Sequence, residues 1–342
     1  MEFSKWFVRL NWIALVLIFL VVIAGSLVRI TGSGMGCPDW PKCFGEWVPP
    51  TTDANLPDNY KDIYSQKRTQ KLEKFTKFLK SIGLEETAQQ LENDPSILIE
   101  QDFNARKTWT EYGNRLVGFL SGNALLIAFI WILARYRKHR KLLLVAAINL
   151  IILIVQAWFG SIVVASNLVP WTITVHLFLA LVIIGLQLYV LRMISPSQKT
   201  NLTLPKTSIY LIWTIFLITF YQMFLGTQVR EEIDELIKYG YTQSEWITQI
   251  GLPFYIHRSF SWLVLILMIY LFYKNEKQDK FKPIRWLFGI LILELVSGVS
   301  LAYLNMPGLV RTAHLVFAST MFGILMMLLF RVKKRPFISK NI

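Results

Sequence analysis

The stretch that decides the fold is residues 25–47, GSLVRITGSGMGCPDWPKCFGEW, where an apolar run gives way to a polar segment. Arg29 ends the apolar run and a glycine-rich turn follows it. Two cysteines, Cys37 and Cys43, then flank a Pro-Asp-Trp-Pro core. Glycine and proline at this density mark turns, so the stretch predicts a membrane helix that ends in a compact, turn-rich loop at the bilayer surface.

The composition extends this interpretation to the whole chain. Of its 342 residues, 54% are hydrophobic and only 17% are charged, which is too apolar for a soluble globular domain. About 20 apolar residues span a bilayer as a helix, the form that satisfies backbone polar groups inside lipid. We find eight such runs, at residues 10–30, 112–134, 142–165, 170–193, 207–229, 254–273, 284–304 and 310–330.

The positions of the basic residues argue against a nucleic-acid partner, although the net charge is +14. Lysine and arginine gather in alternate gaps, whereas the opposite gaps 166–171, 231–235 and 305–309 are short and neutral or acidic. The positive-inside rule then predicts that both termini are cytoplasmic, and the long segment 31–111 falls outside by alternation. The basic gaps are residues 5–9, 135–141, 192–206, 274–285 and 331–335.

The start of the chain favours a multi-pass protein of a bacterial plasma membrane. No signal-peptide cleavage site and no transit segment precedes the first apolar run. Cys37 and Cys43 then lie on the oxidising side, where a disulfide can persist. The sequence leaves open whether such a bridge is structural or redox-active.

An internal repeat divides the chain into two halves, residues 1–195 and 196–342. Four short motifs occur twice in the same order, which predicts an all-α polytopic membrane protein with eight transmembrane helices in two repeated, parallel four-helix bundles. The matches are GSLVR at 25–29 with GTQVR at 226–230, Tyr112–Arg115 with Tyr255–Arg258, Gln156, Gly160 and Asn167 with Glu294, Gly298 and Asn305, and Thr174–Leu177 with Thr312–Leu315.

The halves differ in their outer segments. KLEKFTKFLKSIGL at 71–84 places Leu72, Phe75, Leu79 and Ile82 at helical spacing, which predicts a short amphipathic helix on the membrane surface. The C-terminal half has the shorter EEIDELIKYG at 231–240. Each segment is either a lid over its bundle or a passive surface helix.

Three of the four histidines lie near the outer end of a span, where ionisable residues mark functional sites. His257 and His314 open two helices of the C-terminal half, so they can face each other across one bundle, as two imidazoles hold a haem. The alternative is that both only bond to neighbouring helices. His139 lies in a basic gap, and we expect it to be solvated.

The equivalent positions of the N-terminal half are Asn114 and His176. Asparagine is a poor ligand for haem iron, which leaves His176 as the axial candidate. Glu111, one turn before Asn114, suits a general base or an electrostatic stabiliser, and its alternative is a helix-start acid favoured by the dipole. Glu294 is either a proton-relay residue or an interhelical hydrogen-bonding group.

Four arginines accompany these positions. Guanidinium groups suit the carboxylates of haem propionates, and the alternative is snorkelling to lipid headgroups. The candidates are Arg29, Arg115, Arg230 and Arg258.

TGSGMGCPDWPKCFG at 31–45, the E-x-x-[H/N]-R motif at 111–115 and the three helix-borne histidines resemble haem A synthase. The match covers all eight spans and is weakest over residues 48–106. The resemblance implies oxidation of the C8 methyl of haem O to a formyl group by successive hydroxylations. It also implies a substrate haem in the N-terminal half and a haem b cofactor in the C-terminal half.

Carried over by residue, the resemblance makes His257 and His314 ligands of haem b and turns His176 toward the substrate iron. Glu111 becomes the catalytic acid/base, and Cys37 with Cys43 the cysteine pair of the family. Asn114 departs from the family pattern, which usually has histidine there. The implied partners are haem O, the membrane enzyme that makes it, the bilayer and a membrane electron acceptor, with a homo-oligomer left open.

Two other functions would use the same residues. A non-catalytic di-haem electron carrier would need the histidines but not Glu111. A membrane thiol–disulfide oxidoreductase would cycle Cys37 and Cys43 and gives no reason for the matched histidines. The cysteine signature together with Glu111 favours the synthase.

Overall fold

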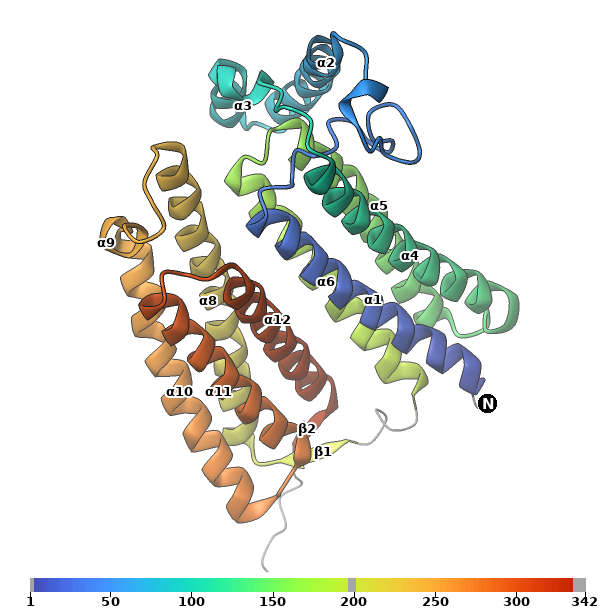
Figure 1. The fold of residues 1–342 in the computed structure, drawn as a ribbon. Coiled ribbons are helices and arrows are strands. Elements are labelled where there is room, and N and C mark those ends of the chain that lie inside the picture. The colour runs from blue at the N-terminus through green and yellow to red at the C-terminus, as the bar shows by residue number, and fades with distance from the viewer. Residues whose placement is uncertain (1–2, 196–200, 335–342) are drawn as a thin grey trace, which may run out of the picture. The chain divides into compact units, whose positions relative to one another are not determined.

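The computed structural model describes residues 3–195 and 201–334, and helices dominate it (Figure 1). Lys199 and Arg335 of two basic gaps, and the start of the predicted C-terminal half, lie outside the described residues. Within these residues, eight helices are long and apolar enough to cross a membrane, which confirms the predicted spans. They are α1 Lys5–Ile30, α4 Ala105–Arg135, α5 Arg140–Ala165, α6 Pro170–Ile194, α8 Lys206–Lys238, α10 Leu252–Gln278, α11 Lys282–Tyr303 and α12 Gly308–Arg331.

The remaining elements are short and lie between or beside the spans. The segment between α1 and α4 contains η1 Asp53–Asn55, α2 Tyr60–Ser81, α3 Glu85–Asn93 and η2 Pro95–Leu98. Helix α9, Trp246–Gln249, lies between α8 and α10. Strands β1 Leu202–Leu204 and β2 Val332–Lys334 pair in parallel, with Leu202 opposite Val332.

The chain divides into two compact units. The first consists of Val16–Leu126 and Ile148–Ile183, and the second of the rest of the described chain. Helices α1, α4, α5 and α6 contribute to both units. The predicted division at residues 195 and 196 therefore stays a prediction.

Each half closes a ring of four helices. In the C-terminal half α8 packs against α10 and α12, and α11 packs against the same two helices. In the N-terminal half Gly25 of α1 faces Asn114 of α4, and Gly160 of α5 faces His176 of α6. Gly122 of α4 meets the side chain of Leu153 of α5, and Gln187 of α6 donates to the backbone carbonyl of Asn11 of α1 at 3.0 Å.

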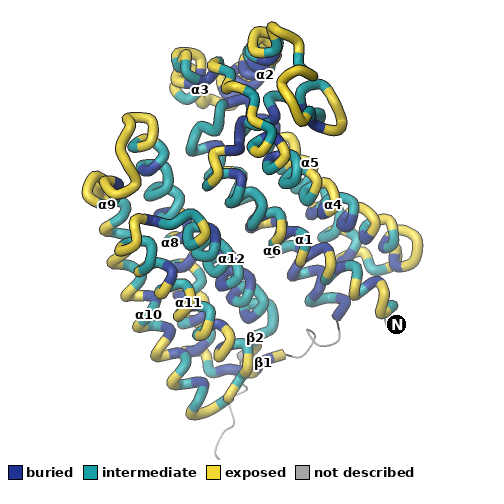
Figure 2. The backbone as a smooth tube through the Cα atoms, viewed as in Figure 1, coloured by how far each residue is buried: buried dark blue, intermediate teal, exposed yellow. Residues whose placement is uncertain are grey.

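The outward faces of the spans carry large apolar side chains. Phe119, Ile154, Trp262 and Ile266 are each more than 60% exposed. Figure 2 shows exposed stretches along α4, α5, α10 and α11. Contiguous apolar surface of this kind is rare on soluble proteins, and it agrees with a multi-pass membrane protein.

The turns between the third and fourth helices of each half share one backbone conformation. Asn167 and Leu168 have φ of 52° and 64°, and Asn305 and Met306 have φ of 53° and 51°. Left-handed backbone is uncommon outside glycine, so its occurrence at matched pairs supports the repeat. An outer segment binds each turn: the Asn167 amide donates to the carbonyl of Ser96 at 3.0 Å, and Gln243 donates to that of Met306 at 3.1 Å.

The predicted surface helices differ from the observed ones. Helix α2 begins at Tyr60 rather than near residue 71, and Ile82 lies beyond its end, 53% exposed. Leu72, Phe75 and Leu79 are buried, and protein covers them rather than lipid. The covering residues are Ala88, Leu91, Ile97, Phe159 and Ile162.

The segment 231–240 is not a separate surface helix, because α8 continues through it to Lys238. No proline or glycine interrupts α8 after Gly226. Arg230 and Asp234 form an ion pair of 2.7 Å at helical spacing, which supports the continuation.

A buried ion pair ties α2 to the segment after η2. Arg68 and Glu100 approach to 2.5 Å, and their side chains are 1% and 5% exposed. Arg68 also donates to the carbonyl of Ile97 at 2.8 Å. Burial raises the pKa of Glu100 above its ordinary value, and the charge of Arg68 opposes that rise. The pair orients the segment more than it stabilises it, because desolvation offsets the attraction.

Candidate functional site

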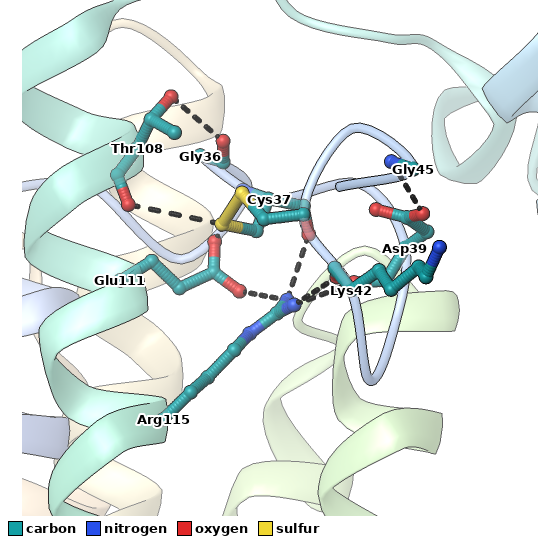
Figure 3. The surroundings of a disulfide bond; sticks show 9 residues. Gly36, Cys37, Asp39, Lys42, Gly45, Thr108, Glu111 and Arg115 are labelled. Atoms are coloured by element: carbon teal, nitrogen blue, oxygen red, sulfur yellow. Dashed lines mark hydrogen bonds and ion pairs between the residues drawn. A yellow bond between two sulfur atoms is a disulfide. The ribbon is translucent and has the colours of Figure 1, made fainter. Parts of the chain in front are cut away.

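The cysteine loop rests on the first turns of α4 (Figure 3). Cys37 and Cys43 form a disulfide. The backbone N–H of Cys37 donates to Glu111 Oε2 at 2.7 Å. Arg115 donates to the carbonyls of Cys37, Asp39 and Lys42 at 2.8, 2.5 and 2.9 Å. One helix therefore holds the loop through an acceptor and a donor four residues apart.

Glu111 and Arg115 also bind each other. Arg115 Nη2 lies 2.5 Å from Glu111 Oε1, and the two side chains are 13% and 4% exposed, the carboxylate being the more buried. Each carboxylate oxygen has a donor in this arrangement. A carboxylate has about four acceptor positions, so Glu111 keeps capacity for a further proton or donor. Its acid/base role remains a prediction.

Among the glycines of the TGSGMG turn, Gly36 is the one that the close approach of the loop to α4 requires. Its carbonyl accepts from the Thr108 hydroxyl at 2.8 Å. A Cβ at Gly36 would lie 2.6 Å from the backbone carbonyl of Lys107, which cannot move without displacing α4. A Cβ at Gly34 would meet only the side-chain methyls of Leu168 at a similar distance.

Gly36→Ala is expected to lift the loop off α4 and to destabilise it by about 1–3 kcal/mol, as overpacking does. Gly34→Ala is the matched control, because the Leu168 side chain can change rotamer. The rate at which a water-soluble phosphine reduces the disulfide measures loop opening. Equal rates in the two variants would contradict the contact argument.

An aromatic cluster packs on the other side of the loop. The ring of Phe44 meets Tyr60, Tyr64 and Phe103 edge-on, with centroids 6.0, 5.5 and 5.6 Å apart. Tyr64 is 5% exposed, and its burial raises the pKa of its phenol from 10.0 to about 12.

The carboxylates around Tyr64 act on its pKa in the same direction as its burial. The carboxylates of Asp39, Glu46 and Glu100 raise its pKa further. Lys67 Nζ lies 4.8 Å from the ring centroid. The fold thus favours the neutral phenol.

Tyr64→Phe is expected to keep the outer segment folded at higher pH. Because the pKa of Tyr64 is raised in the folded protein, its contribution to stability is complete below about pH 10 and is lost as the pH rises through about 12. The loss is at most about 2–3 kcal/mol. Circular dichroism during an alkaline titration measures the midpoint, which should rise in the variant; an unchanged midpoint would refute the assignment.

The four ligand-type residues, Asn114, His176, His257 and His314, have the same kind of surroundings in the two halves. We call these surroundings, a side chain packed over a glycine of the adjacent helix, a glycine seat. Each residue lies over a glycine of the adjacent helix, and an added Cβ would be tight against His176 and His314 and in ordinary contact with His257 and Asn114. The distances from the glycine's Cβ position are 3.1 Å to His176 Cε1 at Gly160, 3.6 Å to His257 Cε1 at Gly226, 3.3 Å to His314 Cε1 at Gly298, and 3.9 Å to Asn114 Oδ1 at Gly25.

Three of these glycines have a polar residue four positions earlier, and this residue contacts the histidine that lies over the glycine. Gln156 and Gln222 donate to the backbone carbonyls of His176 and His257 at 3.0 and 2.9 Å. At the third position Glu294 Oε1 lies 3.3 Å from His314 Nε2.

Sequence analysis missed Gly25, Gly226, Gln222 and Ser297. The spacing of Gln222 and Gly226 repeats that of Gln156 and Gly160, and Gly25 matches Gly226 in the repeat of 25–29 with 226–230. Ser297 lies 2.8 Å from His314 Nδ1, and no pattern in the sequence announces it.

The paired histidines fit a haem. The ring centroids of His257 and His314 are 6.3 Å apart. Two imidazoles on one metal, each with a nitrogen–metal bond of about 2 Å, have centroids about 6 Å apart. Ser297 bonds the Nδ1 of His314, the partner by which proteins orient an axial imidazole.

Three side-chain atoms of the four ligand-type residues are buried without a hydrogen-bond partner. They are Asn114 Oδ1, His176 Nδ1 and His257 Nδ1. Buried polar atoms are nearly always paired, so these indicate a partner that the chain does not supply. The separation of the His257 and His314 rings suits a haem in the C-terminal half, and His176 offers one ligand-type imidazole in the N-terminal half.

The four predicted propionate arginines have different surroundings. Arg29 lies in the last turn of α1. Arg115 holds the cysteine loop, and Arg230 pairs with Asp234. Arg258 lies over the rings of Phe254 and Tyr255, 5.8 and 5.5 Å from their centroids. Propionate binding stays a prediction for all four.

The chain is similar to proteins of one family over most of its length. The family model COX15-CtaA, described as cytochrome oxidase assembly protein, matches residues 8–85 and 73–326. Haem A synthase of Wolbachia pipientis wMel is 23% identical, with 94% of this chain and 92% of that protein covered. The haem A synthases of Geobacillus kaustophilus and Flavobacterium johnsoniae are 22% and 23% identical, with 97% and 93% of this chain and 93% and 95% of theirs covered.

Proposed function

The chain belongs to the COX15-CtaA family of cytochrome oxidase assembly proteins, and from this premise we propose that it is a haem A synthase. This oxidoreductase converts the C8 methyl group of haem O into the formyl group of haem A. Two hydroxylations add two oxygen atoms, and the resulting diol loses one of them as water. Four electrons leave the methyl carbon in total.

One observation carries the division into a substrate half and a cofactor half. In the repeat, Asn114 corresponds to His257, so Glu111 corresponds to Phe254. In the N-terminal half the arginine four residues on binds the Glu111 carboxylate, and in the C-terminal half it lies over the Phe254 ring. Only the N-terminal half therefore has an acid/base group at this helix entrance.

Haem O is the proposed substrate of the N-terminal half. His176 from α6 would face its iron, and Glu111 from α4 would move protons at the reacting carbon. Loss of water from a diol needs one proton added to the leaving hydroxyl and one removed from the other, which suits one carboxyl group. The cysteine loop covers this group, because Cys37 and Arg115 hold it on both oxygens.

Haem b is the proposed cofactor of the C-terminal half. His257 and His314 would hold it, supported by their separation and by Ser297 behind His314. The bound haem would supply one-electron transfer. Both histidines would hold the haem, and Gln222 donates to the backbone carbonyl of His257.

The proposed setting is a bacterial plasma membrane with both termini cytoplasmic and the cysteine loop outside. The basic residues in alternate gaps support this orientation. The Cys37–Cys43 disulfide supports an oxidising compartment for the loop. The membrane enzyme that makes haem O is the proposed neighbour.

Mass analysis of extracted pigments tests the function. Cells that make haem O are compared with and without this protein. Haem A, or its hydroxylated precursor, should appear only with the protein. Bound haem b with unconverted haem O, under reducing conditions that support related synthases, would instead identify a di-haem electron carrier.

A further inference from the structure

We propose that Asn114 leaves one axial position of the N-terminal haem open to a small exogenous ligand, whereas His257 and His314 close both positions of the C-terminal haem. The proposal rests on the proposed function, since it requires a haem in the N-terminal half. It concerns a property of this chain's own residue 114.

The internal repeat identifies residue 114 as a ligand position. Asn114 and His257 occupy matched places on α4 and α10. Each lies over a matched glycine, Gly25 of α1 and Gly226 of α8. The seat is therefore the same, and only the side chain in it differs.

The asparagine side chain does not reach as far as histidine in that seat. Its terminal oxygen is two bonds from Cβ, and the far nitrogen of an imidazole is three. The amide oxygen is also a hard ligand suited to magnesium or calcium, whereas imidazole suits iron. His176 on α6 then remains as the one axial side chain of the N-terminal half.

The room around the amide supports an open position. Asn114 Oδ1 is 3.9 Å from the Cβ position of Gly25, the loosest of the four seats, and the three histidines lie at 3.1–3.6 Å from theirs. This oxygen is buried and accepts no hydrogen bond. The amide oxygen is thus left without a donor, and the NH₂ of the same amide can donate to a diatomic ligand bound at the iron.

Carbon monoxide and cyanide are the probes, because each needs a free axial position on the iron. In the wild-type protein with both haems bound, CO should bind to about half of the reduced haem, and the oxidised protein should show one high-spin and one low-spin signal. Asn114→His should abolish CO binding and yield two low-spin haems. His257→Asn, the reciprocal variant, should lower the haem content of the C-terminal half, and the C-terminal haem that it retains under haem excess should bind CO.

A conservative variant tests the amide separately. Asn114→Leu keeps the branching at Cγ and has no polar atoms, so CO should still bind but with a shifted C–O stretching frequency. An unshifted frequency would refute the polar contact. Loss of CO binding in Asn114→Leu would show that Asn114 does not act by leaving the position open.

The outcomes separate this inference from the proposed function. Two low-spin haems and no CO binding in the wild-type protein would overturn the inference and leave the two haem sites standing. A single haem that survives His176→Ala would overturn both, because the N-terminal half would then hold no haem. Spin state and CO binding do not depend on turnover.

Discussion

Replacing His257 or His314 by alanine is expected to weaken haem binding in the C-terminal half strongly, and replacing both is expected to abolish it. Each histidine supplies one side of a pair whose rings are 6.3 Å apart, so removal of either leaves one axial bond. Loss of an outer-shell partner already costs about 10–100-fold in metal affinity, and loss of a ligand should cost more than about 100-fold. The haem-to-protein ratio and the low-spin absorption of the purified variants measure the loss.

Two further variants should show a partial loss of haem binding and no loss, respectively. Ser297→Ala removes the hydroxyl 2.8 Å from His314 Nδ1 and should weaken haem binding by about 10–100-fold without abolishing it. His139→Ala should leave the haem content unchanged, because His139 follows α4 and packs against the ring of Phe3 at 5.2 Å. Full haem content in the double variant of His257 and His314 would refute the placement of the cofactor.

Glu111→Gln is expected to lower the rate of haem O conversion by about 10²–10⁴-fold while both haems stay bound. The carboxylate is the one acid/base group at the helix entrance, and glutamine of the same shape cannot carry its proton. Glutamine still accepts from the Cys37 N–H, although its NH₂ cannot accept from Arg115. Single-turnover conversion of bound haem O, followed by mass analysis, measures the rate.

The control must separate chemistry from loop geometry, because Glu111 also holds the cysteine loop. Thr108→Val removes the 2.8 Å hydrogen bond to the Gly36 carbonyl and leaves the carboxylate in place. It should loosen the loop, measured by faster disulfide reduction, and retain most of the conversion rate. Equal loss of rate in the two variants would assign Glu111 a structural role alone.

The internal repeat marked several residues of the site in the sequence. The histidines and Asn114 stand out because a repeat marks their positions twice. The glycine seats carried the same kind of signal, in the four-residue spacing of Gln156 with Gly160 and of Gln222 with Gly226. Ser297 had none, because a serine in an apolar helix is ordinary until its neighbour is known.

The spans, the family and the proposed orientation depend on residues that are close together in the sequence, so the sequence alone determined them. Spans α1, α4, α5, α6, α8, α10, α11 and α12 follow from the length of apolar runs, since a backbone in lipid must bond within its own helix. The family follows from contiguous motifs, and the orientation proposed for the membrane rests on the charge of short gaps.

Tertiary structure alone decided how residues distant along the chain combine. Glu111 and Arg115 meet Cys37 across more than 70 positions, and no local pattern encodes that contact. Phe159 and Ile162 cover the apolar face of α2, which by periodicity alone resembles a face for lipid. Periodicity shows that a face must be buried, but the partner that buries it depends on how the whole chain packs.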